Sequence, residues 1–194
     1  INSTTNPNLF SVRDDRMKVG MIDSTGNIIV PIQYYTCWVL ENLECIKCKY
    51  IQGHYTLWDV KGQALTKEIY EEIHGHKDFP NVLFAQLADS HKWQILDRQG
   101  QIQCRELVDS YYWFPLGFKC EKDGLTAIFN LSGRQLTGFV YKNASRAFST
   151  VEEAEKRVQT LGLPSGTRLV CKATNPAGKQ VYIDDAGKEY EVKK

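Results

Sequence analysis

The sequence predicts a mainly β protein built from about five copies of one short unit. Two observations lead to this prediction. Aromatic residues make up 11% of the 194 residues, which favours strands, and a short signature recurs along the chain. The signature is an apolar residue, an Asp or Asn, two variable residues and a Gly. Its five copies are Ile22–Gly26, Trp58–Gly62, Leu96–Gly100, Phe129–Gly133 and Ile183–Gly187.

Each signature is predicted to form a tight turn between two strands. An Asp or Asn side chain can accept a hydrogen bond from the backbone two residues further on, and Gly takes the positive φ that closes the turn. The aspartates of the signature are therefore interpreted as turn residues and not as catalytic acids. Successive signature glycines are 36, 38, 33 and 54 positions apart, so the last interval contains an insertion.

Each unit is predicted to be a meander of three strands. The first lies about fourteen residues before the signature Gly, the second leads into the turn, and the third leaves it. The eighth residue after Gly is Tyr34, Tyr70, Val108 or Tyr141. The chain is interpreted as a single repeat domain, 1–194, and chain order leaves open whether the array is an open curve or propeller-like. The predicted units span residues 8–37, 43–73, 80–114, 115–147 and 165–194.

The insertion predicts one amphipathic α-helix near residues 149–161. Ser149–Glu153 offers overlapping capping boxes, and Val151, Ala154, Val158 and Leu161 recur at helical spacing. Gly162 is expected to end the helix, so that the helical insertion spans 149–162. A helix that covers the sheet with its apolar stripe is favoured over a helix that binds a partner.

The segment Lys18–Tyr35 resembles one unit of the bacterial WG-repeat family. That unit carries Trp-Gly, an Ile-Asp-x-x-Gly turn, and a strand that ends near Pro and Tyr. The resemblance extends over nearly the whole chain but is degenerate, because Trp93 stands at the Trp position of one copy, Gly20 at the Gly position of another, and no copy has both. It implies an all-β repeat scaffold without characteristic catalytic residues, in a family whose members include neighbours of bacterial toxins.

The net charge of +1 gives the chain no overall field that would attract nucleic acid or an anionic membrane. No run of apolar residues approaches the length of a membrane span. No glycine-rich phosphate loop is present, so no cofactor is expected. A soluble cytoplasmic protein is predicted, with a periplasmic or secreted location as the alternative if a signal segment was removed before Ile1.

The six cysteines are interpreted as reduced core residues, with some disulfides as an alternative. Cys45 and Cys48 have C-x-x-C spacing, but residues three apart on a strand project to opposite faces, which argues against a shared metal. His74, His76 and Asp78 are the alternative metal site, because alternate residues of a strand share a face. A solvated loop is favoured over that site.

Aromatic clusters after the third strands are the candidate partner-binding residues. Strict alternation buries only half of each cluster, which leaves amphipathic aromatics for an interface. Burial on both faces, between sheet and helix, is the favoured alternative. Two histidines in corresponding loops are added to them. The candidates are Tyr34, Tyr35, Trp38, Tyr111, Tyr112, Trp113, His54 and His91.

These features predict a non-enzymatic scaffold that binds a protein partner. The specific expectation is an immunity protein that neutralises a bacterial toxin. The alternative is an extracytoplasmic protein that binds carbohydrate or envelope material by stacking on the Tyr and Trp clusters. An enzyme would have to rest on the histidine cluster, because no Ser-His-Asp arrangement or acid/base pair stands apart from the repeat.

Overall fold

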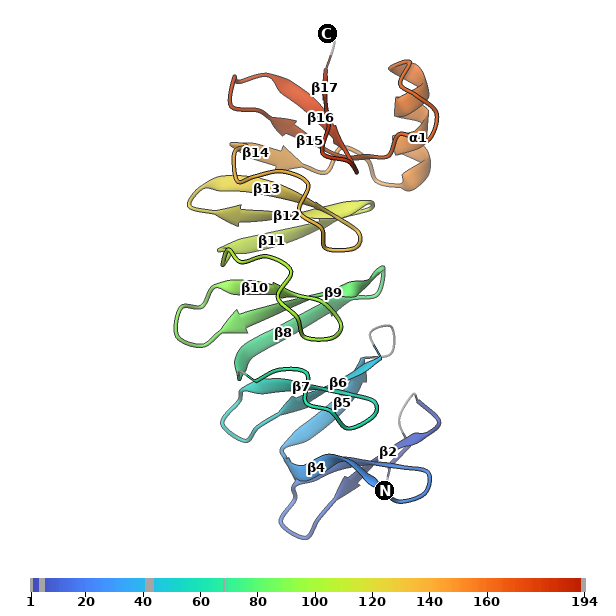
Figure 1. The fold of residues 1–194 in the computed structure, drawn as a ribbon, viewed down its shortest axis with the longest axis vertical. Helices are drawn as coiled ribbons and strands as arrows, with labels where there is room; N and C mark the ends of the chain where they lie inside the picture. The colour runs from blue at the N-terminus through green and yellow to red at the C-terminus, as the bar shows by residue number, and fades with distance from the viewer. Residues whose placement is uncertain (1, 4–5, 41–43, 68, 193–194) are drawn as a thin grey trace. The chain divides into compact units, whose positions relative to one another are not determined.

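The computed structural model describes residues 2–3, 6–40, 44–67 and 69–192. The chain divides into two compact units, Ile1–Arg105 and Glu106–Lys194, and each is described by itself. Antiparallel strands dominate both units (Figure 1). The prediction of a mainly β protein is therefore confirmed.

The first unit contains two sheets whose strands follow chain order, so that each strand pairs with its neighbour in the sequence. The first sheet is β1 (Asn2–Ser3), β2 (Leu9–Arg13), β3 (Val19–Asp23) and β4 (Ile28–Tyr34). The second sheet is β5 (Thr36–Leu40), β6 (Cys45–Lys49), β7 (Tyr55–Asp59), β8 (Tyr70–His76), β9 (Phe79–Leu87) and β10 (Trp93–Leu96). A single residue pair, Tyr55 with Tyr70, joins β7 to β8.

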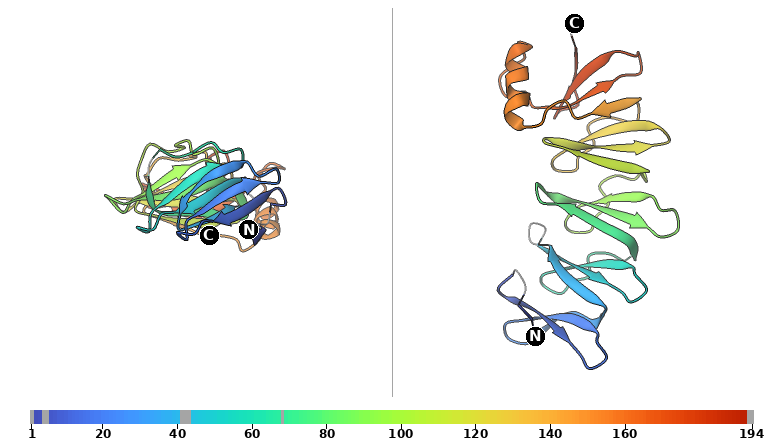
Figure 2. Two further views of the ribbon diagram at one scale, coloured as in Figure 1. Left: turned by 90° about the horizontal axis from the view of Figure 1, so that it is seen from below. Right: turned by 180° about the vertical axis from the view of Figure 1, so that it is seen from behind.

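The second unit also contains two meandering sheets. One is β11 (Ser110–Phe114), β12 (Gly117–Lys122) and β13 (Leu125–Asn130). The other is β14 (Asn143–Ser145), β15 (Leu169–Thr174), β16 (Gln180–Asp184) and β17 (Glu189–Glu191). Helix α1 (Val151–Thr160) enters between β14 and β15, and it lies beside this sheet in Figure 1 and in the right view of Figure 2.

Four of the units are preceded by an additional strand that the prediction did not include. β5, β8, β11 and β14 each pair antiparallel with the first strand of the unit that follows. The third predicted strand is full in β4 and short in β17. In three other units it is reduced to isolated bridges, at Ala64, at Ile102, and at Gln135 and Tyr141.

All five signatures form the same turn. In each, the side-chain oxygen of the Asp or Asn accepts from the backbone N–H groups two and four residues further on, at 2.7–3.1 Å. The Gly has a φ between +76° and +95° in every copy. The turn prediction is confirmed, and at Asn130 an amide oxygen accepts the same two backbone hydrogen bonds.

Three of the signature glycines, Gly62, Gly100 and Gly187, also pack against backbone. A Cβ on Gly62 would lie 3.0 Å from the carbonyl oxygen of Ile29, and one on Gly100 would lie 2.3 Å from that of Leu65. A Cβ on Gly187 would lie 2.5 Å from the oxygen of Leu136. Each of these carbonyls belongs to the residue three positions after the preceding signature glycine, namely Gly26, Gly62 or Gly133. At these three positions the Gly thus allows close contact with the segment that follows the preceding signature, as well as the turn.

The residues at the eighth position after Gly form part of the core. Tyr34, Tyr70, Val108 and Tyr141 are all at most 4% exposed. The Tyr34 hydroxyl accepts a hydrogen bond from Trp58 Nε1 at 2.9 Å, and burial raises its pKa. The repeated Tyr therefore packs against neighbouring strands, which explains why the position is aromatic or branched.

Helix α1 begins and ends as predicted. The Thr150 hydroxyl accepts from Glu153 N at 3.3 Å, and the Glu153 carboxylate accepts from Ser149 N at 2.6 Å. Ala154 and Val158 are buried against a cluster that includes Phe148 and Tyr182, whereas Val151 is 39% exposed. Within the described residues, no helix has the length and apolar character needed to cross a membrane.

The Asp23 turn provides a test by pH. Hydrogen bonds from the Thr25 hydroxyl and the Asn27 amide lower the pKa of Asp23 from 3.8 to about 2. A depressed pKa in the folded state stabilises the fold above pH 3.8, and this stabilisation is lost as the pH falls through about 2. We expect the stability advantage of the wild type over Asp23→Asn, measured by urea unfolding, to shrink across this window. Parallel pH profiles for the two proteins would contradict the assignment.

Candidate functional site

The β5–β10 sheet carries a connected series of aromatic and ionic contacts. Trp38 on β5 stands opposite Lys47 on β6, and its ring centroid lies 6.4 Å from that of Tyr55 on β7. The Lys47 ammonium lies 4.0 Å from the centroid of the Tyr55 ring. Trp38 is 44% exposed, so it forms the open end of the series.

The series continues onto β8 and β10. Lys47 Nζ donates to the carbonyl of Ile73 at 2.7 Å and lies 3.5 Å from Glu72 Oε2. Glu72 Oε2 is 3.8 Å from His74 Nε2, and the His74 and Trp93 ring centroids are 4.9 Å apart. We call these residues the aromatic ridge: Trp38, Lys47, Tyr55, Glu72, His74 and Trp93.

Lys47 holds the middle of the ridge together. Its burial lowers its pKa, while the charge of Glu72 and the hydrogen bond to it raise the pKa. Burial also lowers the pKa of His74. A cation held between a carboxylate and an aromatic ring is worth about 0.5–1 kcal/mol for the ring contact alone. Tyr55 is only 7% exposed and supports the ridge from within, so the surface that the ridge offers combines the exposed indole of Trp38 with fixed charges.

Tyr35 extends the exposed aromatic area beside the ridge. Its side chain is 58% exposed, and its backbone N–H donates to the carbonyl of Lys49 at 2.8 Å. The Lys49 ammonium lies 5.1 Å from the centroid of the Tyr55 ring, and its pKa is raised chiefly by the Tyr55 hydroxyl. The structure thus gathers two of the predicted residues, Tyr35 and Trp38, on one sheet edge.

Tyr34 does not belong to this surface. It is only 1% exposed and lies in the core beside Trp58, at the other side of the strand from Tyr35. The prediction that Tyr34 contacts a partner is therefore corrected. Its hydroxyl is buried and accepts hydrogen bonds from three side chains of the fold, so it cannot meet a partner.

The second predicted cluster is mostly packed within its own unit. Tyr112 is 52% exposed, whereas Tyr111 and Trp113 are half-buried. Trp113 contacts Phe118 edge-on at 5.3 Å and Tyr111 at 5.9 Å between centroids. Tyr112 stands opposite Lys119, as Trp38 stands opposite Lys47, so both clusters place one exposed aromatic next to a lysine.

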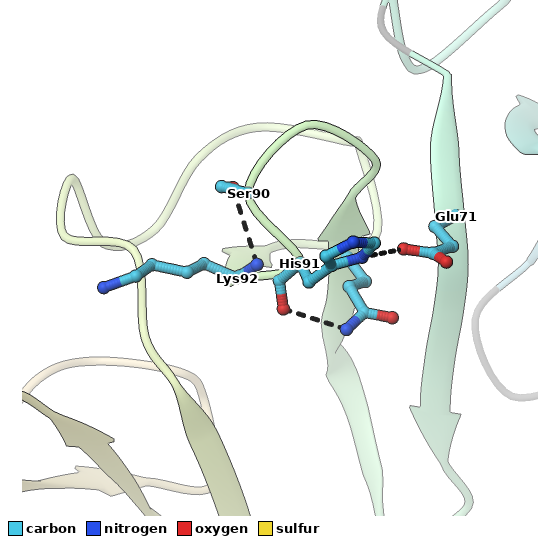
Figure 3. Close-up of polar contacts among 5 residues, drawn as sticks. Glu71, Ser90, His91 and Lys92 are labelled. Carbon is cyan, nitrogen blue, oxygen red and sulfur yellow. Dashed lines mark hydrogen bonds and ion pairs between the residues drawn. The ribbon is translucent and has the colours of Figure 1, made fainter.

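The two loop histidines differ in their surroundings. His54 is half-buried in the turn before β7, where its carbonyl accepts from Tyr50 N at 2.8 Å. His91 is exposed with a φ of +54°, and its Nδ1 lies 2.5 Å from Glu71 Oε2 (Figure 3). Gln86 Nε2 donates to the His91 carbonyl at 2.9 Å, which holds the loop in this conformation. The contact with Glu71 is exposed, and exposed polar pairs of this kind are worth about 0–1 kcal/mol.

The histidines of β8 point toward different partners. His74 contacts Glu72 and Trp93, whereas His76 Nδ1 lies 3.8 Å from Asp78 Oδ2 and its ring meets Phe79 edge-on. A register shift between Gly75 and His76 breaks the regular alternation on which the predicted site depended. Among the described residues, no three His, Cys, Asp or Glu side chains form a group that could hold a metal ion.

The cysteines are buried free thiols, as the favoured interpretation held. Cys45 packs in the cluster with Tyr55 and Leu57, while Cys48 packs in the cluster with Met21 on the opposite face of β6. Burial raises the pKa of Cys45 to about 12. The expectation that the C-x-x-C pair projects to opposite faces is confirmed.

Sequence reasoning missed four members of the ridge: Lys47, Tyr55, Glu72 and Trp93. The missing signal was the strand Thr36–Leu40, whose hairpin with Cys45–Lys49 sets Trp38 opposite Lys47. A groove of about 650 Å³ between α1, the segment 163–169 and Leu116 was also unforeseen, because residues distant in the chain form it jointly. Leu116, Val158 and Leu163 make its apolar part, and Glu155 and Arg168 stand among its polar lining.

Comparison with known proteins adds no relative to this description. A scan against protein-family models finds no match. A search of curated proteins likewise finds no significant match.

Proposed function

We propose that this chain is a non-enzymatic β-repeat scaffold of the WG-repeat type that binds a protein partner through the aromatic ridge and Tyr35. The observation that carries the proposal is the exposed indole of Trp38, backed by Tyr55 and Lys47 on a hydrogen-bonded sheet. The five turns of one geometry support the repeat character, and so do the close approaches of Gly62, Gly100 and Gly187 to the backbone of the preceding segment.

The composition of the surface favours a protein over other ligands. Trp and Tyr dominate the binding energy of protein interfaces, and they do so best on a rigid support, which limits the entropy lost on binding. Lys47 and Glu72 place both charge signs beside Trp38, so the surface can meet mixed charge on a partner. The overall charge of +1 gives no general attraction for polyanions.

The test is an affinity capture from native lysate with the tagged chain and two variants. Trp38→Ala removes the exposed indole, and Ile28→Ala is the matched control because Ile28 is 63% exposed in the same unit on β4. We expect one stoichiometric protein to bind the wild type and Ile28→Ala. Binding to Trp38→Ala should weaken by about 30-fold, as for a hot-spot residue worth about 2 kcal/mol.

Two results would contradict this proposal. Equal capture by Trp38→Ala and the wild type would remove the ridge from the interface. Retention on polysaccharide or envelope fractions, without a protein, would favour the carbohydrate-binding alternative, since an exposed indole also stacks on sugar rings.

The specific partner that we propose is a bacterial toxin, which the resemblance to WG repeats suggests. The captured protein, expressed alone, should then arrest growth. Co-expression of the wild-type chain should relieve the arrest, and co-expression of Trp38→Ala should not. A captured protein that has no effect on growth would exclude the immunity role and leave partner binding intact.

A further inference from the structure

We propose that Cys37 and Cys48 form a redox modification site, in which a small-molecule disulfide such as glutathione disulfide converts the two thiols into a cross-strand disulfide. The inference concerns the core side of β5 and β6 and is independent of the proposed partner. It rests on the pairing of these two residues, on their shared face and on the position of β5 in its sheet.

Cys37 stands directly opposite Cys48 in the antiparallel ladder of β5 and β6. Directly opposed residues of such a ladder have Cα atoms about 4.5–5.5 Å apart, whichever hydrogen-bonding class the pair belongs to. That interval lies within the roughly 4.4–6.8 Å that a disulfide spans. Of the ladder pairs in the described part of the chain, this is the only one with cysteine on both strands.

The two side chains lie on the same face of the sheet. Both belong to the cluster that contains Met21 and Ile46, so both thiols point toward the first sheet. Burial and a hydrogen bond with the Cys37 thiol raise the pKa of Cys48. Because the two residues are already paired in register and share one buried cluster, the bond requires no movement of one strand past the other.

Access is provided from the β5 side. β5 is the edge strand of its sheet and pairs there with β6, and Cys37 keeps 8% of its surface exposed while Cys48 keeps none. Edge strands open locally at a lower free energy than central strands do. Cys37 is therefore the residue that meets the oxidant, and Cys48 is the resolving thiol.

The chemistry balances as two exchange steps. The Cys37 thiolate attacks glutathione disulfide, forms a mixed disulfide and releases one glutathione thiolate. The Cys48 thiolate then attacks the Cys37 sulfur and releases the second glutathione. The protein loses two electrons and two protons overall, and glutathione disulfide is reduced to two molecules of glutathione.

The experiment uses the full chain, purified in reductant and then incubated with glutathione disulfide, both folded and during refolding from urea. A third sample is held in urea throughout. After free thiols are alkylated, cleavage after lysine and glutamate separates the three neighbouring cysteines, because the fragments are residues 19–41, 45–47 and 48–49. Mass spectrometry then identifies which fragments are linked.

We expect fragment 19–41 linked to fragment 48–49 in the folded or refolded sample. In urea, a link between Cys45 and Cys48 should compete with the Cys37–Cys48 link, because Cys45 is closer to Cys48 in the sequence. The ratio of the two links should therefore shift several-fold toward Cys37–Cys48 on folding. Cys48→Ser should leave Cys37 as a glutathione adduct, and Cys45→Ser should keep the link. The proposal would be overturned if Cys37 and Cys48 were recovered as alkylated thiols in both the folded and the refolded sample. It would also be overturned if the folded protein showed the same links, in the same ratio, as the sample held in urea.

Discussion

Replacing Gly100 by alanine is expected to destabilise the unit of residues 1–105 by about 2–5 kcal/mol, from backbone strain together with steric overlap. Gly100 has a φ of +76°, which strains any residue with a Cβ. The new Cβ would also lie 2.3 Å from the carbonyl oxygen of Leu65 and 2.9 Å from its carbonyl carbon. Both are backbone atoms, so a whole segment must move to relieve the overlap.

Gly26 is the matched control for this substitution. It occupies the same turn position with a φ of +90°, but a Cβ there meets nothing within 4 Å. Gly26→Ala should therefore cost only the backbone strain, about 1–2 kcal/mol. Three of the four tryptophans, at positions 38, 58 and 93, lie in this unit, so fluorescence-detected urea unfolding measures the difference. Equal losses in the two variants would show that contact between repeats contributes nothing.

Replacing Phe118 by alanine is expected to destabilise the unit of residues 106–194 by about 3–5 kcal/mol, the usual cost of deleting a buried aromatic ring. Phe118 and Phe129 are opposed on β12 and β13, both fully buried, and their rings stack at 4.9 Å between centroids. Trp113 also packs against Phe118. The substitution therefore leaves a cavity that borders two other aromatic rings.

Leu125→Ala is the control, because Leu125 belongs to the same hairpin but is 38% exposed. The loss of stability should stay within about 0.5 kcal/mol, which is usual for surface substitutions. Unfolding monitored by circular dichroism compares the two, and the near-ultraviolet signal of Trp113 should change in Phe118→Ala alone. Similar midpoints for both variants would mean that the Phe118 cavity is filled by rearrangement.

Local features of the fold could be predicted from the sequence. The Asp23 turn and the α1 cap depend on hydrogen bonds that close within four residues, so the pattern of residues is sufficient to identify them. The burial of Cys45 and Cys48 on opposite faces follows from strand alternation alone.

The candidate site could be predicted only in part. Trp38 and Tyr35 were found as aromatic residues of a cluster, but Tyr34 was misplaced because alternation does not say which face of a strand is buried. Glu72 and Trp93 come next to Lys47 and His74 through contacts between strands that no local pattern links.

The sequence by itself determined the β class, the five turns and the capped helix, because each depends on interactions among neighbours in the chain. The tertiary structure alone decided that β5 pairs with β6, that Tyr34 lies inside while Trp38 lies outside, and that Cys37 stands opposite Cys48. These outcomes depend on strand register, and a shift by one residue would exchange the two faces of β5. Register is set by packing across the sheets, so it appears only when distant segments meet.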